Sequence, residues 1–295
     1  MSLETINRCP VCDNDSFDHY LTCTDYLVSQ KNFVIQACRK CNFRLTSPRP
    51  DSGEIGLYYK SEQYVSHNDQ SGGLINTAYK IVRNFTLRSK VKLVDKEKGG
   101  VGRILDVGCG TGAFLESCRT AGWQVVGVEP DAEAASVAST KLKIDIQSSI
   151  HKLEKQNPFN VITLWHVLEH IPDLNETIQR FHHHLTNDGS LVIAVPNSDS
   201  YDAQYFKQYW AAYDVPRHLH HFTPATIEPL FKKHNFILRE IKPMVLDAFY
   251  IALLSTRYQT GKTDYLKSVQ IGLKSNTVAQ RTGNSSSQIY IFKKA

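Results

Sequence analysis

The sequence lacks any hydrophobic run long enough to span a bilayer. Its longest apolar stretch, Ala248 to Leu254, is far shorter than the roughly 20 residues of a transmembrane helix. The first residues, Met1 to Arg8, contain no apolar core of signal-peptide length. We therefore expect no membrane partner and a cytoplasmic location.

Dense positive charge is also missing. The 295 residues include 34 basic and 29 acidic side chains, which give a net charge of +5, and no Lys/Arg run resembles a nucleic-acid patch. With 41% hydrophobic and 21% charged residues, the chain is typical of a globular protein with a large core. These values favour a small-molecule substrate over a nucleic acid.

Cysteines are few, but four of the seven form two C-x-x-C pairs. The pairs are Cys9 with Cys12 and Cys38 with Cys41. Each pair can aim two thiolates at one point, and four thiolates complete the tetrahedral site that structural zinc prefers. A thioredoxin-type redox pair and a regulatory disulfide are the alternatives. We predict a zinc-ribbon-like module over residues 1–50.

A connecting segment is expected over residues 51–98. Apolar residues recur near a helical spacing from Leu74 to Val94, which predicts a helix. The segment can also serve as a lid over a ligand, with Tyr59 or Tyr64 reaching into the site, although ordinary packing of these tyrosines explains them equally well. Residues 99–295 then form the main domain.

The chain is organised around the stretch from Arg103 to Leu115. Its apolar residues 104–107 predict a strand, the run Gly108-Cys109-Gly110-Thr111-Gly112 a tight turn, and Ala113 the start of a helix. Three glycines in five residues let a ligand approach the bare backbone. The free N–H groups of the helix's first turn face the same place.

Two ligand classes use such a turn, and a turn that serves only the fold is a third interpretation. The spacing Gly108-x-Gly110-x-x-Ala113 also satisfies the dinucleotide fingerprint. However, the carboxylate of Asp106, two residues before the first glycine, would oppose a pyrophosphate and suits a cationic ligand. The run Leu-Asp-Val-Gly-Cys-Gly-Thr-Gly closely resembles motif I of class I methyltransferases, which use S-adenosylmethionine (SAM).

This resemblance implies a set of cofactor-binding residues. Glu129, at the end of the next strand, is expected to accept both ribose hydroxyls, and the loop with Ser148 and Ser149 is expected to meet adenine. The full predicted set is Asp106, Gly108, Cys109, Gly110, Gly112, Glu129, Pro130, Ser148, Ser149, Trp165 and His166.

Alternating strand and helix patterns predict an α/β fold with a doubly wound, seven-stranded, Rossmann-like sheet that ends in an antiparallel hairpin. We expect strands at 104–107, 124–129, 144–147, 159–165, 190–195, 236–241 and 287–292, with a turn at 187–189. We expect helices at 113–121, 132–142, 177–185, 223–231 and 246–254, and a mobile or helical insertion at 255–286.

His166, Glu169 and His170 form an H-x-x-E-H motif after the fourth strand. Inverted zinc peptidases have the same spacing, but their motif lies within a helix, and no third ligand is evident here. The segment resembles the Leu-Glu-His-(Val/Ile)-Pro block of ubiquinone-pathway O-methyltransferases, in some of which a Glu replaces His166 and an acid–acid–His cluster is associated with a divalent ion. We expect His166 near the sulfonium or the acceptor, with Glu169 and His170 holding the loop.

An aromatic and histidine-rich segment follows the fifth strand. Its Trp…Asp-x-Pro-Arg-His-Leu-x-His-Phe pattern resembles bacterial methyltransferases of surface-glycan and small-metabolite pathways. The predicted acceptor-binding residues are Trp210, Tyr213, Asp214, Arg217 and His218. Ring stacking beside polar groups suits a sugar or a phenol. His218 is either a base or a structural histidine tied to Asp214.

The expected activity is transfer of a methyl group from SAM to a small polar acceptor such as a sugar, a phenol or a related metabolite. An oxygen acceptor needs a base, for which His166 and His218 are the candidates. The joining of a cysteine module to this domain also resembles deoxysugar C-methyltransferases, which carry a further C-terminal domain. The alternatives are a zinc-ribbon protein that binds or methylates RNA and a non-enzymatic SAM-binding protein.

Overall fold

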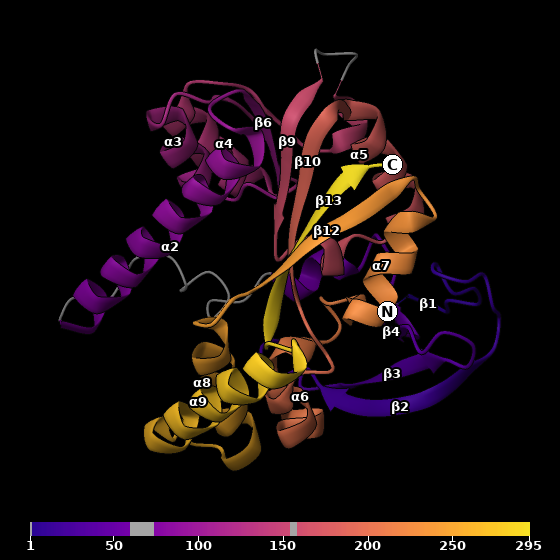
Figure 1. Cartoon of the computed structure of the whole chain (residues 1–295). Helices are drawn as coiled ribbons and strands as arrows, with labels where there is room; N and C mark the ends of the chain where they lie inside the picture. Colours follow the sequence, from indigo (N-terminus) through magenta and orange to yellow (C-terminus); the bar gives the residue numbers. More distant parts are fainter. Residues whose placement is uncertain (1, 60–73, 154–157) are drawn as a thin grey trace.

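The computed structural model describes residues 2–59, 74–153 and 158–295, with only the backbone for residues 74–83 (Figure 1). A central sheet has the order β12-β13-β10-β9-β6-β7-β8. Its strands are β6 (Arg103–Val107), β7 (Gln124–Val128), β8 (Ile146–Gln147), β9 (Phe159–Trp165), β10 (Leu185–Pro196), β12 (Phe236–Pro243) and β13 (Ser287–Lys294). Strands β6 to β10 are parallel, and β13 is antiparallel to both β10 and β12. The predicted seven-stranded sheet and its antiparallel hairpin are therefore confirmed.

Helices cover both faces of this sheet because consecutive strand residues point to opposite sides. On β6, Ile104 belongs to one hydrophobic cluster and Leu105 to another. The first cluster includes residues of α2 (Leu74–Lys98), α3 (Ala113–Thr120) and α4 (Ala132–Leu142), and the second includes residues of α5 (Leu174–His184) and α7 (Pro224–Lys232). Figure 1 shows α3 and α4 on one side of the sheet and α5 and α7 on the other.

The N-terminal segment builds a second sheet that the main domain completes. It has the order β11-β4-β3-β2, with β2 (Phe17–Thr24), β3 (Asn32–Cys38), β4 (Arg44–Thr46) and β11 (His220–His221). Strands β1 (Leu3–Glu4) and β5 (Arg49–Pro50) pair separately, and the short helix η1 (Ile55–Tyr59) follows. Because β11 comes from the predicted acceptor segment, the cysteine module and this segment share one sheet.

In proportion to their lengths, the strands expected at 190–195 and 144–147 differ most from the prediction. The turn expected at 187–189 is wrong, since β10 runs through it: Leu185 pairs with Phe159 and Ser190 with Val161, so the extra residues of β10 bulge out. The strand expected at 144–147 is reduced to the two residues of β8.

The insertion expected at 255–286 is largely helical. Helix α8 (Asp247–Thr260) continues beyond its predicted end at 254, and α9 (Tyr265–Thr282) follows. Asp264 begins α9 as its N-cap, and Gly261 and Gly283 end the two helices in the left-handed conformation. Tyr64 and the rest of the connecting segment between residues 60 and 73 lie outside the described residues. In the described part of the chain, no helix has the length and apolarity to cross a membrane.

Candidate active site

The predicted glycine turn joins β6 to α3. Gly108, Gly110 and Gly112 all have positive φ angles, of 71°, 53° and 77°. A Cβ on Gly108 would meet the Val167 side chain at 2.4 Å, whereas a Cβ on Gly110 would meet nothing within 4 Å. The backbone at Gly110 is thus open to a ligand, and the remaining glycines allow the tight turn.

Two carboxylates frame this turn. Asp106 is 2% exposed and accepts a 2.6 Å hydrogen bond from Thr163, and burial raises its pKa to about 7. At the end of β7, Glu129 accepts from the N–H groups of Gly110 at 2.8 Å and Asp131 at 2.9 Å. A carboxylate oxygen accepts two hydrogen bonds, so each oxygen of Glu129 can still accept from a hydroxyl. This arrangement fits a ribose beside an open backbone.

Other predicted cofactor residues lie around the turn with varied exposure. Cys109 is buried, and Pro130 and Ser148 are exposed. Ser149 caps the short helix η2 (Ile150–Lys152), because its hydroxyl accepts from the His151 N–H. The adenine contact of the two serines stays a prediction.

Lys90 of α2 is a site residue that the sequence analysis missed. Its ammonium lies 4.2 Å from the centre of the Trp165 ring, a cation–π contact. Burial lowers the pKa of Lys90, while the charges of Asp106 and Asp247 oppose that shift. Lys90 lies between Leu87 and Val91, which are partly buried on one face of α2. A lysine on an otherwise apolar helix face was the sequence feature that could have indicated its place in the site.

His166 lies where β9 ends, with a positive φ of 57°. Its Nδ1 is 3.5 Å from Glu169 Oε1, and its Nε2 is 3.1 Å from Oδ2 of Asp247 in α8. Burial opposes the charged imidazole, but the two carboxylates raise the pKa of His166 to about 9. At neutral pH both ring nitrogens of His166 are therefore protonated, and the imidazole is positively charged. A strained backbone at such a point is typical of functional sites.

Glu169, His170 and His218 come together beside His166. One ligand atom of each lies within 4.8 Å of the others. Glu169 is 1% exposed, and neither of its carboxylate oxygens has a hydrogen-bond partner among the described residues. The histidines lower the pKa of Glu169 although burial opposes this shift. His218 joins two residues of the H-x-x-E-H motif in this cluster, and His166 does not belong to it. The three residues can hold a divalent ion.

The histidine tautomer at His218 follows from its neighbours. Its Nδ1 lies 2.8 Å from the Ala212 carbonyl oxygen, which can only accept, so Nδ1 carries the hydrogen. In the neutral ring, Nε2 then keeps its lone pair, at 4.0 Å from both Glu169 Oε1 and Asp214 Oδ2. Tyr59, predicted to reach into the site, contacts His170 instead, with Oη 2.9 Å from Nδ1.

The predicted acceptor residues lie together, but most are engaged with one another or with protein groups. Trp210 donates to Asp202 at 2.7 Å and packs edge-on against Tyr213, with ring centres 4.9 Å apart. Arg217, 1% exposed, bonds Asp214 and also reaches Asp25 of the cysteine module at 3.0 Å. Four of the five predicted residues line a cavity of only about 10 Å³: Trp210, Tyr213, Asp214 and Arg217. Tyr26 of the module and Tyr258 of α8 also line it.

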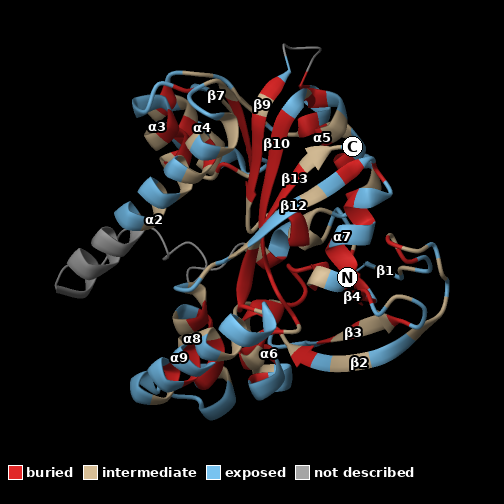
Figure 2. Cartoon of the chain, viewed as in Figure 1, coloured by how far each residue is buried: buried red, intermediate tan, exposed pale blue. Residues whose placement is uncertain are grey.

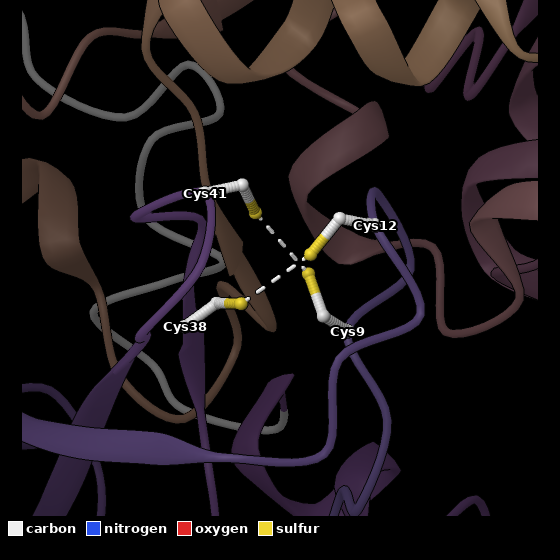
Figure 3. Close-up of side chains that lie close together, drawn as sticks. All are labelled: Cys9, Cys12, Cys38 and Cys41. Atoms are coloured by element: carbon white, nitrogen blue, oxygen red, sulfur yellow. Dashed lines mark hydrogen bonds between the residues drawn. The ribbon is translucent and has the colours of Figure 1, made fainter.

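The four paired cysteines converge as predicted (Figure 3). Sγ of Cys9 is 3.5 Å from that of Cys41, and Sγ of Cys12 is 3.5 Å from that of Cys38. All four are free thiols. A tetrahedral zinc ion with Zn–S bonds of about 2.3 Å separates its sulfurs by about 3.8 Å. The donor set and its spacing therefore fit zinc.

Comparisons with known proteins agree with this geometry. The profile of a family described as "Methyltransferase domain" matches residues 79–241, more than half of the chain. A ubiquinone biosynthesis O-methyltransferase of Rickettsia typhi is 25% identical over 205 residues, which cover 64% of this chain and 82% of that protein. The relative of the same name from Vibrio atlanticus is 38% identical over 95 residues, 29% of this chain and 40% of that protein. A Rickettsia prowazekii relative is likewise matched over only 62% of its length.

Solved structures share the fold at low sequence identity. Magnesium protoporphyrin IX methyltransferase from Synechocystis, with bound SAH (S-adenosylhomocysteine), has a TM-score of 0.51 and 13% identity, and the match covers 81% of this chain and 97% of that one. A putative sarcosine dimethylglycine methyltransferase from Galdieria sulphuraria has a TM-score of 0.50 and 13% identity, over 73% and 86% of the two chains. The chain therefore belongs to the methyltransferase-domain family and is a class I SAM-dependent enzyme.

Proposed function

We propose that this enzyme methylates an oxygen atom of a small polar acceptor, such as a sugar, a phenol or a related metabolite. The observation that carries the proposal is the position of His218, whose Nε2 faces the buried Glu169 beside His166. His166 ends β9, the neighbour of β6, from which the glycine turn leads. In such sheets, ligands bind at the carboxyl ends of the strands.

The cofactor residues suit SAM. Glu129 would accept the ribose hydroxyls, the open backbone at Gly110 would lie against the nucleoside, and Asp106 would face a positive group. When bound, SAM supplies a methyl group on a sulfonium. Much of the chemical drive then resides in the donor, so the chain's main task is to align the acceptor.

His218 is the better of the two candidate bases. The acceptor hydroxyl would give its proton to Nε2 of His218, and Glu169 would stabilise the imidazolium that forms. His166 is less suited, because its pKa of about 9 leaves no free lone pair at neutral pH. Its positive charge instead balances Glu169 and Asp247.

We also propose that the four paired cysteines hold zinc. Four protein ligands close a tetrahedral site and leave no position for a substrate, so the ion would be structural. Metal analysis of the purified protein should give one zinc per chain. A substitution of Cys12 by serine should lower that content, whereas the same change at the unpaired Cys118 should not.

Calorimetry and turnover test the proposed function. SAM and SAH should bind and NAD should not, and SAH should form from SAM when sugars or phenols are supplied. Turnover only with an amine or a carbon acceptor would contradict the oxygen assignment. The RNA alternative would require RNA binding that weakens steeply with salt, and no contact in the described structure favours it.

A further inference from the structure

Helix α9 carries an exposed row of apolar side chains. Leu266, Val269 and Leu273 are 71%, 48% and 55% exposed. Their spacing of three and four residues places them on one side of the helix. The opposite side is buried, with Ile271 and Gly272 facing inward. Figure 2 shows pale blue, exposed surface along much of α8 and α9. No described residue of the chain therefore covers this row.

A row of cations runs beside it. Lys267, Lys274 and Arg281 recur every seven residues and so share a second side of α9. Lys267 donates to Gln259 at 3.3 Å, and Lys274 and Arg281 are exposed. Arg257 and Lys262, in α8 and the connecting loop, add positive charge. The segment 247–282, which contains α8 and α9, has only two acids. Asp247 contacts His166, and Asp264 caps α9 by accepting from the Lys267 N–H.

We propose that the outer side of α9 docks on the surface of an anionic lipid bilayer. Apolar side chains flanked by lysine and arginine are what an interfacial helix needs, and such a helix lies in the membrane plane without spanning it. Each cation near an anionic surface strengthens binding about fivefold. The expectation of no membrane partner rested on the lack of a spanning run, and surface docking requires none.

A second copy of the chain fits this surface less well. A symmetric dimer would place the same face of both copies together. The cations Lys267, Lys274 and Arg281 of one copy would then face the same row of cations on the other, with only Asp264 as an acid on this helix. Like charges across an interface are unfavourable. An anionic surface has the complementary charge.

The docking surface lies one helix away from the active site. Gly272 of α9 packs against Phe249 of α8 so closely that a Cβ would meet the ring at 2.5 Å. The same helix α8 supplies Asp247 to His166 and Tyr258 to the acceptor pocket. Docking would hold that pocket close to the lipid surface. The membrane contact itself does not depend on the proposed acceptor.

Sedimentation of the full chain with lipid vesicles tests the proposal. Vesicles of phosphatidylcholine mixed with phosphatidylglycerol should bind the protein, vesicles of phosphatidylcholine alone should bind it weakly, and salt should weaken the first interaction. Lys274→Glu combined with Arg281→Glu should lower the affinity by at least about tenfold. Leu266→Ser combined with Leu273→Ser should also release the protein from the vesicles.

A matched control makes the same charge change elsewhere. Lys92→Glu combined with Lys96→Glu, at exposed positions of α2, should leave vesicle binding within about twofold. Circular dichroism and SAH binding would show that each variant is folded. The proposal fails if the wild-type chain does not bind anionic vesicles, or if the control weakens binding as much as the α9 variant. It also fails if the α9 variants only dissociate a dimer that binds no lipid.

Discussion

The proposed cofactor side and the proposed acceptor side of this active site are built differently. The cofactor side comes from one strand, one turn and the end of the next strand, so Asp106, Gly110 and Glu129 lie within 24 residues of one another. The acceptor side brings together η3 (Leu168–His170), the segment before β11, helix α8 and the cysteine module. One side is local in sequence, and the other depends on long-range packing.

This difference explains what the sequence predicted. A strand followed by closely spaced glycines has few possible conformations, so the turn and its two acids could be located in the sequence. Their expected roles came from the resemblance to motif I. The Glu169–His218 pair could not be located in this way, because its members are 49 residues apart and only the packing of two loops unites them. Lys90 is likewise brought to Trp165 by the fold of α2.

Aromatic composition was less informative than glycine spacing. Trp210 and Tyr213 were predicted to stack on an acceptor, yet they pack edge-on against each other and are each 2% exposed. A ring that binds a ligand and a ring that fills a core have the same sequence pattern. Burial separates them, and here the cysteine module, α8 and α9 together bury the two rings in one hydrophobic cluster.

Metal removal should have the largest effect on the acceptor side. A structural zinc contributes on the order of 10 kcal/mol in small zinc-binding peptides at neutral pH. Chelation should loosen the knuckle before β2, the knuckle at the end of β3 and, through β4, the β11 strand. Methyl transfer should be abolished, while SAH affinity should change by less than about threefold. Equal loss of both would mean that the module supports the whole enzyme.

The buried ion pair between the two segments is the next most sensitive point. Asp25 and Arg217 are each 1% exposed, and their charged atoms are 3.0 Å apart. Asp25→Asn keeps the shape and removes one charge, which in buried pairs costs about 3–5 kcal/mol. Chemical denaturation should measure this loss. The exposed Asp18→Asn, which breaks a surface pair with Arg39, should cost less than about 1 kcal/mol.

Loss of the proposed base should slow the reaction without affecting the cofactor. His218→Ala should lower kcat by about 10² to 10⁴, with little change in SAH affinity, because the cofactor turn lies on another loop. His183→Ala, at an exposed position of α5, is the control and should be fully active. Undiminished turnover of His218→Ala with the true acceptor would rule out the base.

On the proposed cofactor side, substitution of Glu129 should lower the affinity for SAM and SAH. Glu129→Gln replaces a carboxylate that accepts from two backbone N–H groups. Hydrogen bonds to a charged group contribute about 1.5–3 kcal/mol, so calorimetry should show SAM and SAH affinities lower by about 10- to 100-fold. Both ligands should weaken equally, because the ribose is common to them. Glu133→Gln, exposed in α4, should bind normally. Selective loss of SAM would contradict the ribose assignment.

The smallest effect should appear in the pH dependence of stability. The pKa of His166 is raised to about 9 by Asp247 and Glu169, against the effect of burial, while an unfolded histidine titrates near 6.5. The folded state therefore holds this proton more tightly, and the stabilisation is fully present below about pH 6.5 and lost as pH rises through 9. The difference in Tm between wild type and His166→Gln should shrink over that interval. His183→Gln, at the exposed α5 position, should show no such trend. If the difference between wild type and His166→Gln stays constant with pH, the two carboxylates do not hold His166 as a cation, and the choice of His218 as the base loses its support.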